Sequence, residues 1–152
     1  MTIEGGCRCG ATRYTVAIEA LPQTYACHCL HCQTWSGSAF TLNALLPEAL
    51  LAVTGPVAWH QHDGTGGHLS RHQVCGICHT RIANTNGAVP GLVVLRVGTL
   101  DDSDRIAPIA HIWTRRKQPW LVLPADIPNW PEAPSPDAFA MALRASPGDA
   151  AG

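Results

Sequence analysis

The seven cysteines of this 152-residue chain constrain its fold more than any other feature, because they fall into three tight clusters. The clusters are Cys7-x-Cys9, Cys27-x-Cys29-x-x-Cys32 and Cys75-x-x-Cys78, and no cysteine is left over. Sulfurs one or two residues apart on a tight turn can meet the tetrahedral geometry that a soft ion such as zinc prefers, with metal–sulfur distances of about 2.3 Å. The spacing therefore predicts a chain that folds around bound metal.

The cysteine count indicates two zinc ions, held by sites of different kinds. The first and last pairs make a closed four-thiolate set, and the middle cluster makes a local three-thiolate set with one empty position. Closed zinc sites are usually structural, whereas open ones can be catalytic. The closed set is Cys7, Cys9, Cys75 and Cys78, and the open set is Cys27, Cys29 and Cys32. Because the closed set joins segments about seventy residues apart, its metal should contribute strongly to folding.

Other uses of these residues stay open. Either His28 or His31 could complete the middle cluster as a fourth ligand, although an extended segment would point His28 away from both neighbouring cysteines. A redox Cys-x-x-Cys usually lies in a βαβ unit, but no helical period follows the clusters. An odd number of cysteines cannot pair fully into disulfides, and residues 1–6 have no signal-peptide pattern. We therefore expect reduced thiols and a cytoplasmic location.

Composition excludes several classes of partner. Only 14% of the residues are charged and the net charge is −1, which offers no field for nucleic acid or for an acidic membrane. The apolar stretches at 42–51 and 92–97 are far shorter than the roughly 20 residues of a membrane span. We expect one domain that binds small molecules; the sequence says nothing of its oligomeric state.

Frequent glycine and proline divide the chain into short segments, most of which have the alternation of strands. The expected strands are residues 12–18, 40–45, 57–62, 68–74, 92–97 and 106–113. A short helix is expected at 31–35, and another near the C-terminus, with Ser135 as N-cap and Pro136 at the first helical position. Residues 123–136 carry five prolines and should form an extended strap. We expect a zinc-binding domain over 1–131 and a C-terminal extension over 132–152.

The remaining conspicuous residues have ordinary structural explanations. Histidines 60, 62, 68 and 72 should lie on the solvated face of two strands. Tryptophans 59, 113, 120 and 130 should lie in the core or anchor the strap. The run Arg115-Arg116-Lys117 is typical of a solvated turn, although its charges could also contact the carboxylates of a substrate.

Several motifs, in this order, resemble the glutathione-dependent formaldehyde-activating enzyme family over nearly the whole chain to about residue 131. They are Gly-Gly-Cys-x-Cys-Gly at 5–10, Cys-His-Cys-x-x-Cys at 27–32 followed by Ser36-Gly37-Ser38-Ala39-Phe40, Cys-x-x-Cys at 75–78, Gly98-Thr99-Leu100-Asp101, and His111-Ile112-Trp113 with Pro119-Trp120. The resemblance is specific because spacing, order and flanking residues agree together.

The resemblance implies a mainly β fold, the β-tent zinc fold of several coiled antiparallel sheets with few short helices. It also implies a structural zinc on the first and last cysteine pairs, and a labile, catalytic zinc on Cys27, Cys29 and Cys32. The family activity is addition of the glutathione thiol to formaldehyde, giving S-hydroxymethylglutathione, which is classed as a carbon–sulfur lyase reaction. Eukaryotic relatives such as centromere protein V act instead in a chromatin or cytoskeletal setting.

Two positions depart from the usual family pattern. His79 stands where a glycine commonly follows the last cysteine, and Gln33 stands where a basic residue often follows the middle cluster. We expect an enzyme that adds a small thiol, glutathione or another, to formaldehyde or a related aldehyde. The alternative is a non-catalytic zinc module that binds a partner. No Ser-His-Asp set or carboxylate pair is legible, so zinc must supply any chemistry.

Overall fold

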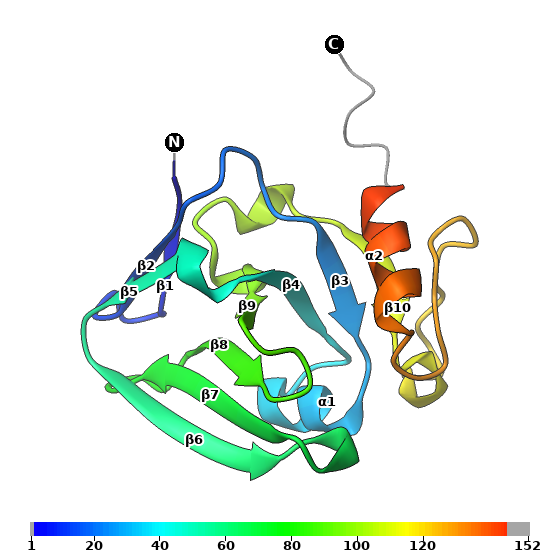
Figure 1. Cartoon of the computed structure of the whole chain (residues 1–152), viewed down its shortest axis with the longest axis horizontal. Helices are drawn as coiled ribbons and strands as arrows, with labels where there is room; N and C mark the ends of the chain where they lie inside the picture. Colours follow the sequence, from blue (N-terminus) through cyan, green and yellow to red (C-terminus); the bar gives the residue numbers. More distant parts are fainter. Residues whose placement is uncertain (1, 146–152) are drawn as a thin grey trace. The chain divides into compact units, whose positions relative to one another are not determined.

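A computed structural model describes residues 2–145, in which ten strands and two α-helices confirm the expected mainly β class (Figure 1). The chain divides into two compact units. Among the described residues, the first comprises 2–22 and 43–106, and the second comprises 23–42 and 107–145. Strand β4 (Thr41–Pro47) starts at the end of a second-unit segment and continues into the first unit.

The first unit contains two antiparallel arrangements of strands. One is a three-stranded sheet in the order β1-β2-β5, formed by β1 (Ile3–Gly6), β2 (Arg13–Val16) and β5 (Leu51–Thr54). The other has the order β4-β9-β8-β7-β6, where β4 is followed by β9 (Leu92–Arg96), β8 (Arg81–Asn86), β7 (Leu69–Cys75) and β6 (Val57–Asp63). Short 3-10 turns follow β4, β6 and β9 along the chain, at Glu48–Leu50, Thr65–Gly67, Val97–Thr99 and Ser103–Arg105.

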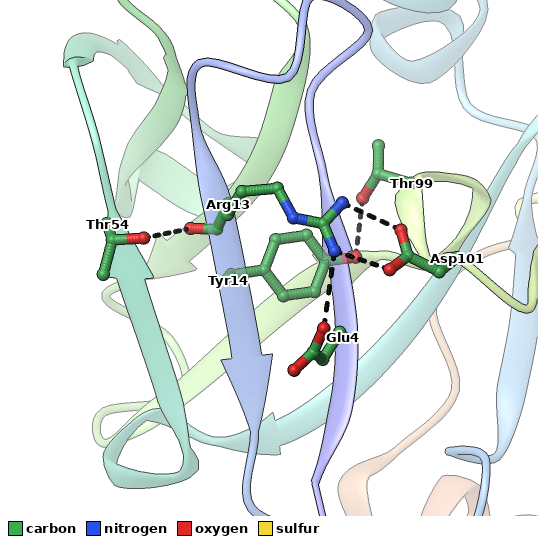
Figure 2. Close-up of polar contacts among 6 residues, drawn as sticks. All are labelled: Glu4, Arg13, Tyr14, Thr54, Thr99 and Asp101. Atoms are coloured by element: carbon green, nitrogen blue, oxygen red, sulfur yellow. Dashed lines mark hydrogen bonds and ion pairs between the residues drawn. The ribbon is translucent and has the colours of Figure 1, made fainter.

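Alternating side chains explain β2, where Tyr14 and Val16 point into the core and are at most 1% exposed. The Tyr14 hydroxyl lies 2.8 Å from the Thr99 hydroxyl (Figure 2). The Thr99 hydroxyl itself donates to the Arg96 carbonyl. Burial raises the pKa of Tyr14 to about 12. A Cβ atom at Gly5 would collide with this hydroxyl. Glycine at this position is therefore required by the close approach of the tyrosine ring.

An exposed ion pair lies beside this tyrosine. Arg13 donates two hydrogen bonds to the carboxylate of Asp101, at 2.9 and 2.5 Å, and its guanidinium lies 3.7 Å from Glu4 (Figure 2). Such a bidentate pair has good geometry, but solvent weakens it because both side chains are about half exposed. It therefore contributes modestly, by tying β2 to the segment that follows β9.

The second unit is built on two parallel strands, whereas the sequence led us to expect antiparallel sheets. Strand β3 (Thr24–Cys27) pairs with β10 (Pro108–Ile112), with Cys27 opposite Ile112. Helix α1 (Leu30–Ser36) follows β3, the 3-10 turn Thr114–Arg116 follows β10, and helix α2 (Pro136–Arg144) closes the described chain.

The helix expected near the C-terminus is confirmed. The Ser135 hydroxyl accepts the amide of Ala138, and Pro136 occupies the first turn of α2. Phe139 from this helix packs edge-on against Tyr25 of β3, with ring centroids 4.9 Å apart. The preceding strap has no regular element beyond a bridge at Asn129, as expected. The domain boundary at residue 131 stays a prediction.

Candidate metal centres and the cleft beside α1

The first and last cysteine pairs meet inside the first unit. The four Sγ atoms of Cys7, Cys9, Cys75 and Cys78 all lie within 4.8 Å of one another. Cys7 follows β1 and Cys75 ends β7, so the ends of two strands bring the pairs together. Cys9 and Cys75, one from each pair, are 66 positions apart in the sequence. The closed four-thiol group that the sequence predicted therefore exists as a geometric unit. Its occupation by zinc stays a prediction.

Polar donors surround this four-thiol group and favour thiolates. The amide of Thr12 donates to Cys7 Sγ at 3.2 Å, and the amide of Ile77 donates to Cys75 Sγ at 3.4 Å. A hydrogen bond from the Thr80 side chain, 3.2 Å from the sulfur, is the main reason that the pKa of Cys78 falls to about 5. The Thr12 side chain is likewise the largest cause that lowers the pKa of Cys75 to about 7.

Cys9 behaves differently from these two thiols. The backbone at Ala11 lowers its pKa, but the neighbouring thiols of Cys7 and Cys78, together with burial, outweigh that effect and raise the pKa to about 11. A group that mixes stabilised thiolates with a crowded thiol suits a divalent cation, because the cation removes the repulsion among the sulfurs. The chemistry of this donor set therefore fits zinc.

The turn after Cys78 explains one departure from the family pattern. His79 has φ 59°, which is the left-handed region that favours glycine. The amide of His79 donates to the Cys75 carbonyl at 3.1 Å, so the tight turn itself fixes this conformation. The family glycine at this position therefore has a backbone reason. By contrast, Gly5 and Gly6 have no positive φ, but a side chain at either would collide with neighbouring atoms.

The middle cluster gathers within the second unit. The Sγ atoms of Cys27, Cys29 and Cys32 lie within 4.8 Å of one another. Cys27 ends β3, Cys29 is the N-cap of α1, and Cys32 lies in the first turn of that helix. The Cys29 sulfur accepts the Cys32 amide at 3.4 Å, so helix capping itself fixes the spacing of two sulfurs. Cys27 and Cys32 are buried, while Cys29 is partly exposed and opens the cluster to solvent.

Crowding in this cluster disfavours negative charge in the absence of a cation. Hydrogen bonds that the Cys27 thiol donates to the sulfurs of Cys29 and Cys32, followed by burial, raise the pKa of Cys27 far above its ordinary value. Cys27 lowers the pKa of Cys29, but Cys32 and burial outweigh it, and the pKa of Cys29 also rises. A bound cation would reverse this, since three thiolates around one ion are attracted to it. The donor set fits zinc with three protein ligands.

No histidine nitrogen joins either sulfur group among the residues that the structure describes. His31 is exposed, and His28 is fully buried with its Nε2 3.0 Å from Nδ1 of His111. Burial, followed by the charges of His111 and Lys117, lowers the pKa of His28 to about 4, and burial also lowers the pKa of His111. The geometry therefore does not support a histidine ligand, and both rings are neutral near pH 7.

Gln33 holds the segment between the middle cysteines in place. Its side-chain nitrogen donates to the carbonyls of His28 and Arg116, both at 2.7 Å, and its oxygen accepts from Gln118 at 2.8 Å. Sequence reasoning treated Gln33 only as a missing charge near a substrate. Its contact with the Arg116 carbonyl joins positions 83 residues apart, so no local signal could have shown it.

An open cleft of about 420 Å³ lies along α1, with Gln33 in its wall. Its lining also includes Thr34, Ser38, Gln118 and Trp120. Trp120 is 69% exposed, so it does not lie in the core, which was one of the two positions expected for it. Trp59 is also exposed, whereas Trp113 and Trp130 are partly buried.

The basic run after β10 is less available for a ligand than the sequence suggested. Arg115 pairs with Glu132 at 2.5 Å and lies over the ring of Trp113. The Lys117 ammonium donates to the Leu121 carbonyl at 2.7 Å. Arg116 is exposed, and no ion pair of its guanidinium occurs among residues 2–145.

One histidine expected in solvent is buried. His72 is 2% exposed, and Arg81 of the neighbouring strand donates to its Nδ1 at 3.1 Å. The Ser70 hydroxyl lies 2.9 Å from the other ring nitrogen. Since Nδ1 accepts a hydrogen bond, Nε2 carries the proton and donates to Ser70, and this pair cannot activate the serine as a nucleophile. His60 and His68 are exposed, as expected.

Comparisons with known proteins bear on the family and the fold of this chain. The family model described as "Glutathione-dependent formaldehyde-activating enzyme" matches residues 2–116. A crystal structure of a Rhodobacter sphaeroides protein is similar in fold, with a TM-score of 0.53 and 20% sequence identity over 70% of this chain and 92% of that chain. No curated protein matches the chain. Within the described residues, no helix is long and apolar enough to cross a membrane.

Proposed function

Since the chain belongs to the family of glutathione-dependent formaldehyde-activating enzymes, we propose that it is a zinc-dependent carbon–sulfur lyase that adds a small thiol to formaldehyde or a related aldehyde. The observation that carries this proposal is the cluster of Cys27, Cys29 and Cys32. Three sulfurs lie within 4.8 Å, and no fourth protein ligand joins them among the described residues. Such a group leaves one position of a tetrahedral ion for a substrate.

The reaction needs no oxidant or reductant. The thiol sulfur bonds to the carbonyl carbon, the C=O π electrons pass to oxygen, and the proton lost by the thiol ends on that oxygen. Zinc held by the three cysteines would lower the pKa of a thiol bound beside them. The protein would contribute mainly positioning, which can be a large part of the barrier when two small molecules must meet.

The surrounding residues support such positioning. The N-cap bond of Cys29 fixes its sulfur relative to Cys32, and Gln33 ties the His28 carbonyl to the turn after β10. The buried ring pair of His28 and His111 ties the same segment to β10. The partly exposed Cys29 marks the side from which a thiol can approach.

The four-cysteine group has a different role in this proposal. Cys7, Cys9, Cys75 and Cys78 would hold a second, structural zinc, since four thiols already complete a tetrahedron. The small-molecule partners are a thiol, glutathione in the family's own reaction, and an aldehyde. A cytoplasmic location remains a prediction of the sequence.

The decisive experiment combines metal content with the reaction itself. Zinc per chain is measured in wild type and in Cys29→Ser, and NMR follows glutathione or another thiol with ¹³C-formaldehyde, with and without each protein. We expect two zinc ions in wild type, one in the variant, and faster adduct formation with wild type alone. If wild type does not exceed the protein-free rate with any thiol, and cobalt in the middle cluster shows a closed four-ligand spectrum unaffected by thiols, a non-catalytic zinc module explains the protein instead.

A further inference from the structure

Strand β6 is the last strand in the order β4-β9-β8-β7-β6, and its outer edge is open (Figure 1). All seven residues of β6, Val57–Asp63, pair with β7, and no described strand pairs with the other side of β6. The edge strands β1 and β10 are covered in part, by bridges from Leu100 and Asn129, and the edge strand β5 has only four residues. Strand β6 is therefore the longest open sheet edge that the structure describes.

The sequence of β6 does little to protect this edge. Open edges pair with further strands unless a lysine, a proline, a bulge or a covering segment prevents it. Strand β6 contains no lysine, arginine or proline, and its ladder with β7 runs to Asp63 without a register shift. Val57 and Trp59 are exposed large apolar residues of this strand, at 38% and 46%. These are the features of an interface.

One face of the β6–β7 hairpin carries one charge of each sign. Residues 59, 61 and 63 point to the same face, which they share with Arg71, because Arg71 is paired with Gln61. The Arg71 guanidinium lies over the Trp59 ring, 4.9 Å from its centroid. Asp63 and Arg71 are both exposed, and neither forms an ion pair with another described residue.

A second copy of this chain supplies both missing partners at once. It brings another open edge of the same length, and it brings the opposite charge for each of the two residues. We propose that β6 pairs antiparallel with β6 of a second copy, so that the two sheets become continuous across a two-fold axis at Gln61. In this register Asp63 lies opposite Trp59 of the second copy, over whose ring that copy's Arg71 lies. The two-fold axis repeats the contact, so both copies pair both charges.

The charges select this register among those that two-fold symmetry allows. Residues that lie opposite each other must point to the same face, so the axis passes through a residue of β6. An axis nearer the start of β6 would move Asp63 away from Arg71 of the second copy. An axis one residue later would keep the charges close but pair only residues 61–63, whereas the axis at Gln61 pairs residues 59–63 of each copy. At the axis, the Gln61 amide meets its own counterpart and can both donate and accept.

The first test is the molecular mass in solution. The zinc-loaded full chain is studied by sedimentation equilibrium from low micromolar to submillimolar concentrations. The buffer is at pH 8, where an ordinary histidine is neutral, because the same register brings His60 opposite His62 of the second copy. We expect reversible formation of a dimer. A chain that stays monomeric over this range overturns the inference and leaves β6 as an edge for an extended segment of another protein.

A charge exchange tests the register. Asp63→Arg and Arg71→Asp each bring like charges together, so each should weaken the dimer about tenfold in low salt. The double variant Asp63→Arg/Arg71→Asp restores opposite charges and should recover part of the affinity. Asp126→Arg is the matched control, because Asp126 is an exposed carboxylate of the second unit, and it should leave the dimer unchanged. No recovery in the double variant, or an equal loss in the control, overturns the inference.

Amide hydrogen exchange tests which strand forms the interface. In an antiparallel pair, alternate residues of β6 direct their amides to β7, and the amides between them point outward. We expect the protection of the outward amides to rise with protein concentration, because they bond to the second copy in the dimer. If the chain forms dimers but these amides exchange at one rate at all concentrations, the dimer uses another surface and the inference is overturned.

Discussion

The four-cysteine group should stabilise the fold more than the middle cluster, because it closes a much longer loop. Cys75→Ser and Cys32→Ser are a matched pair for testing this, since each replaces one sulfur by oxygen at a buried site, 0% and 7% exposed. The cost of the substitution itself is therefore similar in the two variants. What differs is the length of chain that the metal closes.

The loop lengths give the expected magnitude. Cys9 and Cys75 are 66 positions apart, for which the loop-closure relation gives about 4.3 kcal/mol at 25 °C. Cys27 and Cys32 are five positions apart (32 − 27), for which it gives about 2.1 kcal/mol. Cys75→Ser should therefore lose about 2 kcal/mol more unfolding free energy than Cys32→Ser. For a chain of this size, that difference lowers the melting temperature by about a further 4 to 9 °C.

The assay is urea and thermal unfolding of the zinc-loaded proteins, with zinc per chain measured on the same samples. We expect about one zinc ion in each variant and the larger loss of stability in Cys75→Ser. If that variant is insoluble, Cys9→Ser and Cys29→Ser are the replacement pair, since neither of these cysteines is buried. Equal losses in both clusters, or a larger loss in the middle cluster, would refute the division into a structural and an open site.

Three further perturbations test local features of the fold. Tyr14→Phe should cost about 1 kcal/mol at pH 8 through loss of the bond to Thr99. Because the pKa of Tyr14 is raised in the folded protein, its contribution to wild-type stability is complete below pH 10 and is lost as the pH rises through about 12. The loss amounts to about 2.7 kcal/mol, so the unfolding free energies of wild type and Tyr14→Phe should cross near pH 11. Parallel curves of unfolding free energy against pH would contradict this. His79→Gly should leave the free energy of unfolding unchanged or raise it by up to about 1 kcal/mol, as measured by thermal unfolding, because glycine accepts the positive φ of this position more readily than histidine. A clear loss of stability would contradict the argument that the positive φ is unfavourable for histidine. Asp101→Asn should cost about 0.2–1 kcal/mol in low salt and less in 1 M salt, since its pair with Arg13 is exposed, and a loss independent of salt would argue against an ionic contribution.

Alternation of side chains explains why the sequence predicted β7 but missed β3 and β8. Strand β7 alternates until its buried end, so residues 68–74 were recognised. Strand β3 is buried at all four positions and β8 contains mostly polar residues, of which Asn84 is buried, so neither shows a period of two. The partner of His72 was missed for the same reason, because the arginine that donates to its ring belongs to β8.

The grouping of the cysteines could be predicted because the spacing within each cluster is visible in the sequence. Only the joining of the first pair to the last pair needed a long-range assumption. The environment of the sulfurs could not, since it depends on donors from elsewhere in the chain. Thr80 lies two residues from Cys78, but only the folded turn aims its hydroxyl at that sulfur. The parallel pairing of β10 with β3, which places His111 against His28, also joins segments 83 residues apart and leaves no sequence period.

The two thiol groups differ less in their cysteines than in what donates to them. Amides and a hydroxyl point at three sulfurs of the four-cysteine group, and these donors favour thiolates before any metal arrives. In the middle cluster Cys27 and the Cys32 amide lower the pKa of the Cys29 thiol, but the Cys32 thiol and burial outweigh them, and the pKa of Cys27 is also raised. Metal binding at Cys27 and Cys29 must therefore displace their protons. A three-thiol group that no further protein ligand joins among the described residues leaves one position of a tetrahedral ion for exchange, which is what addition of a thiol requires.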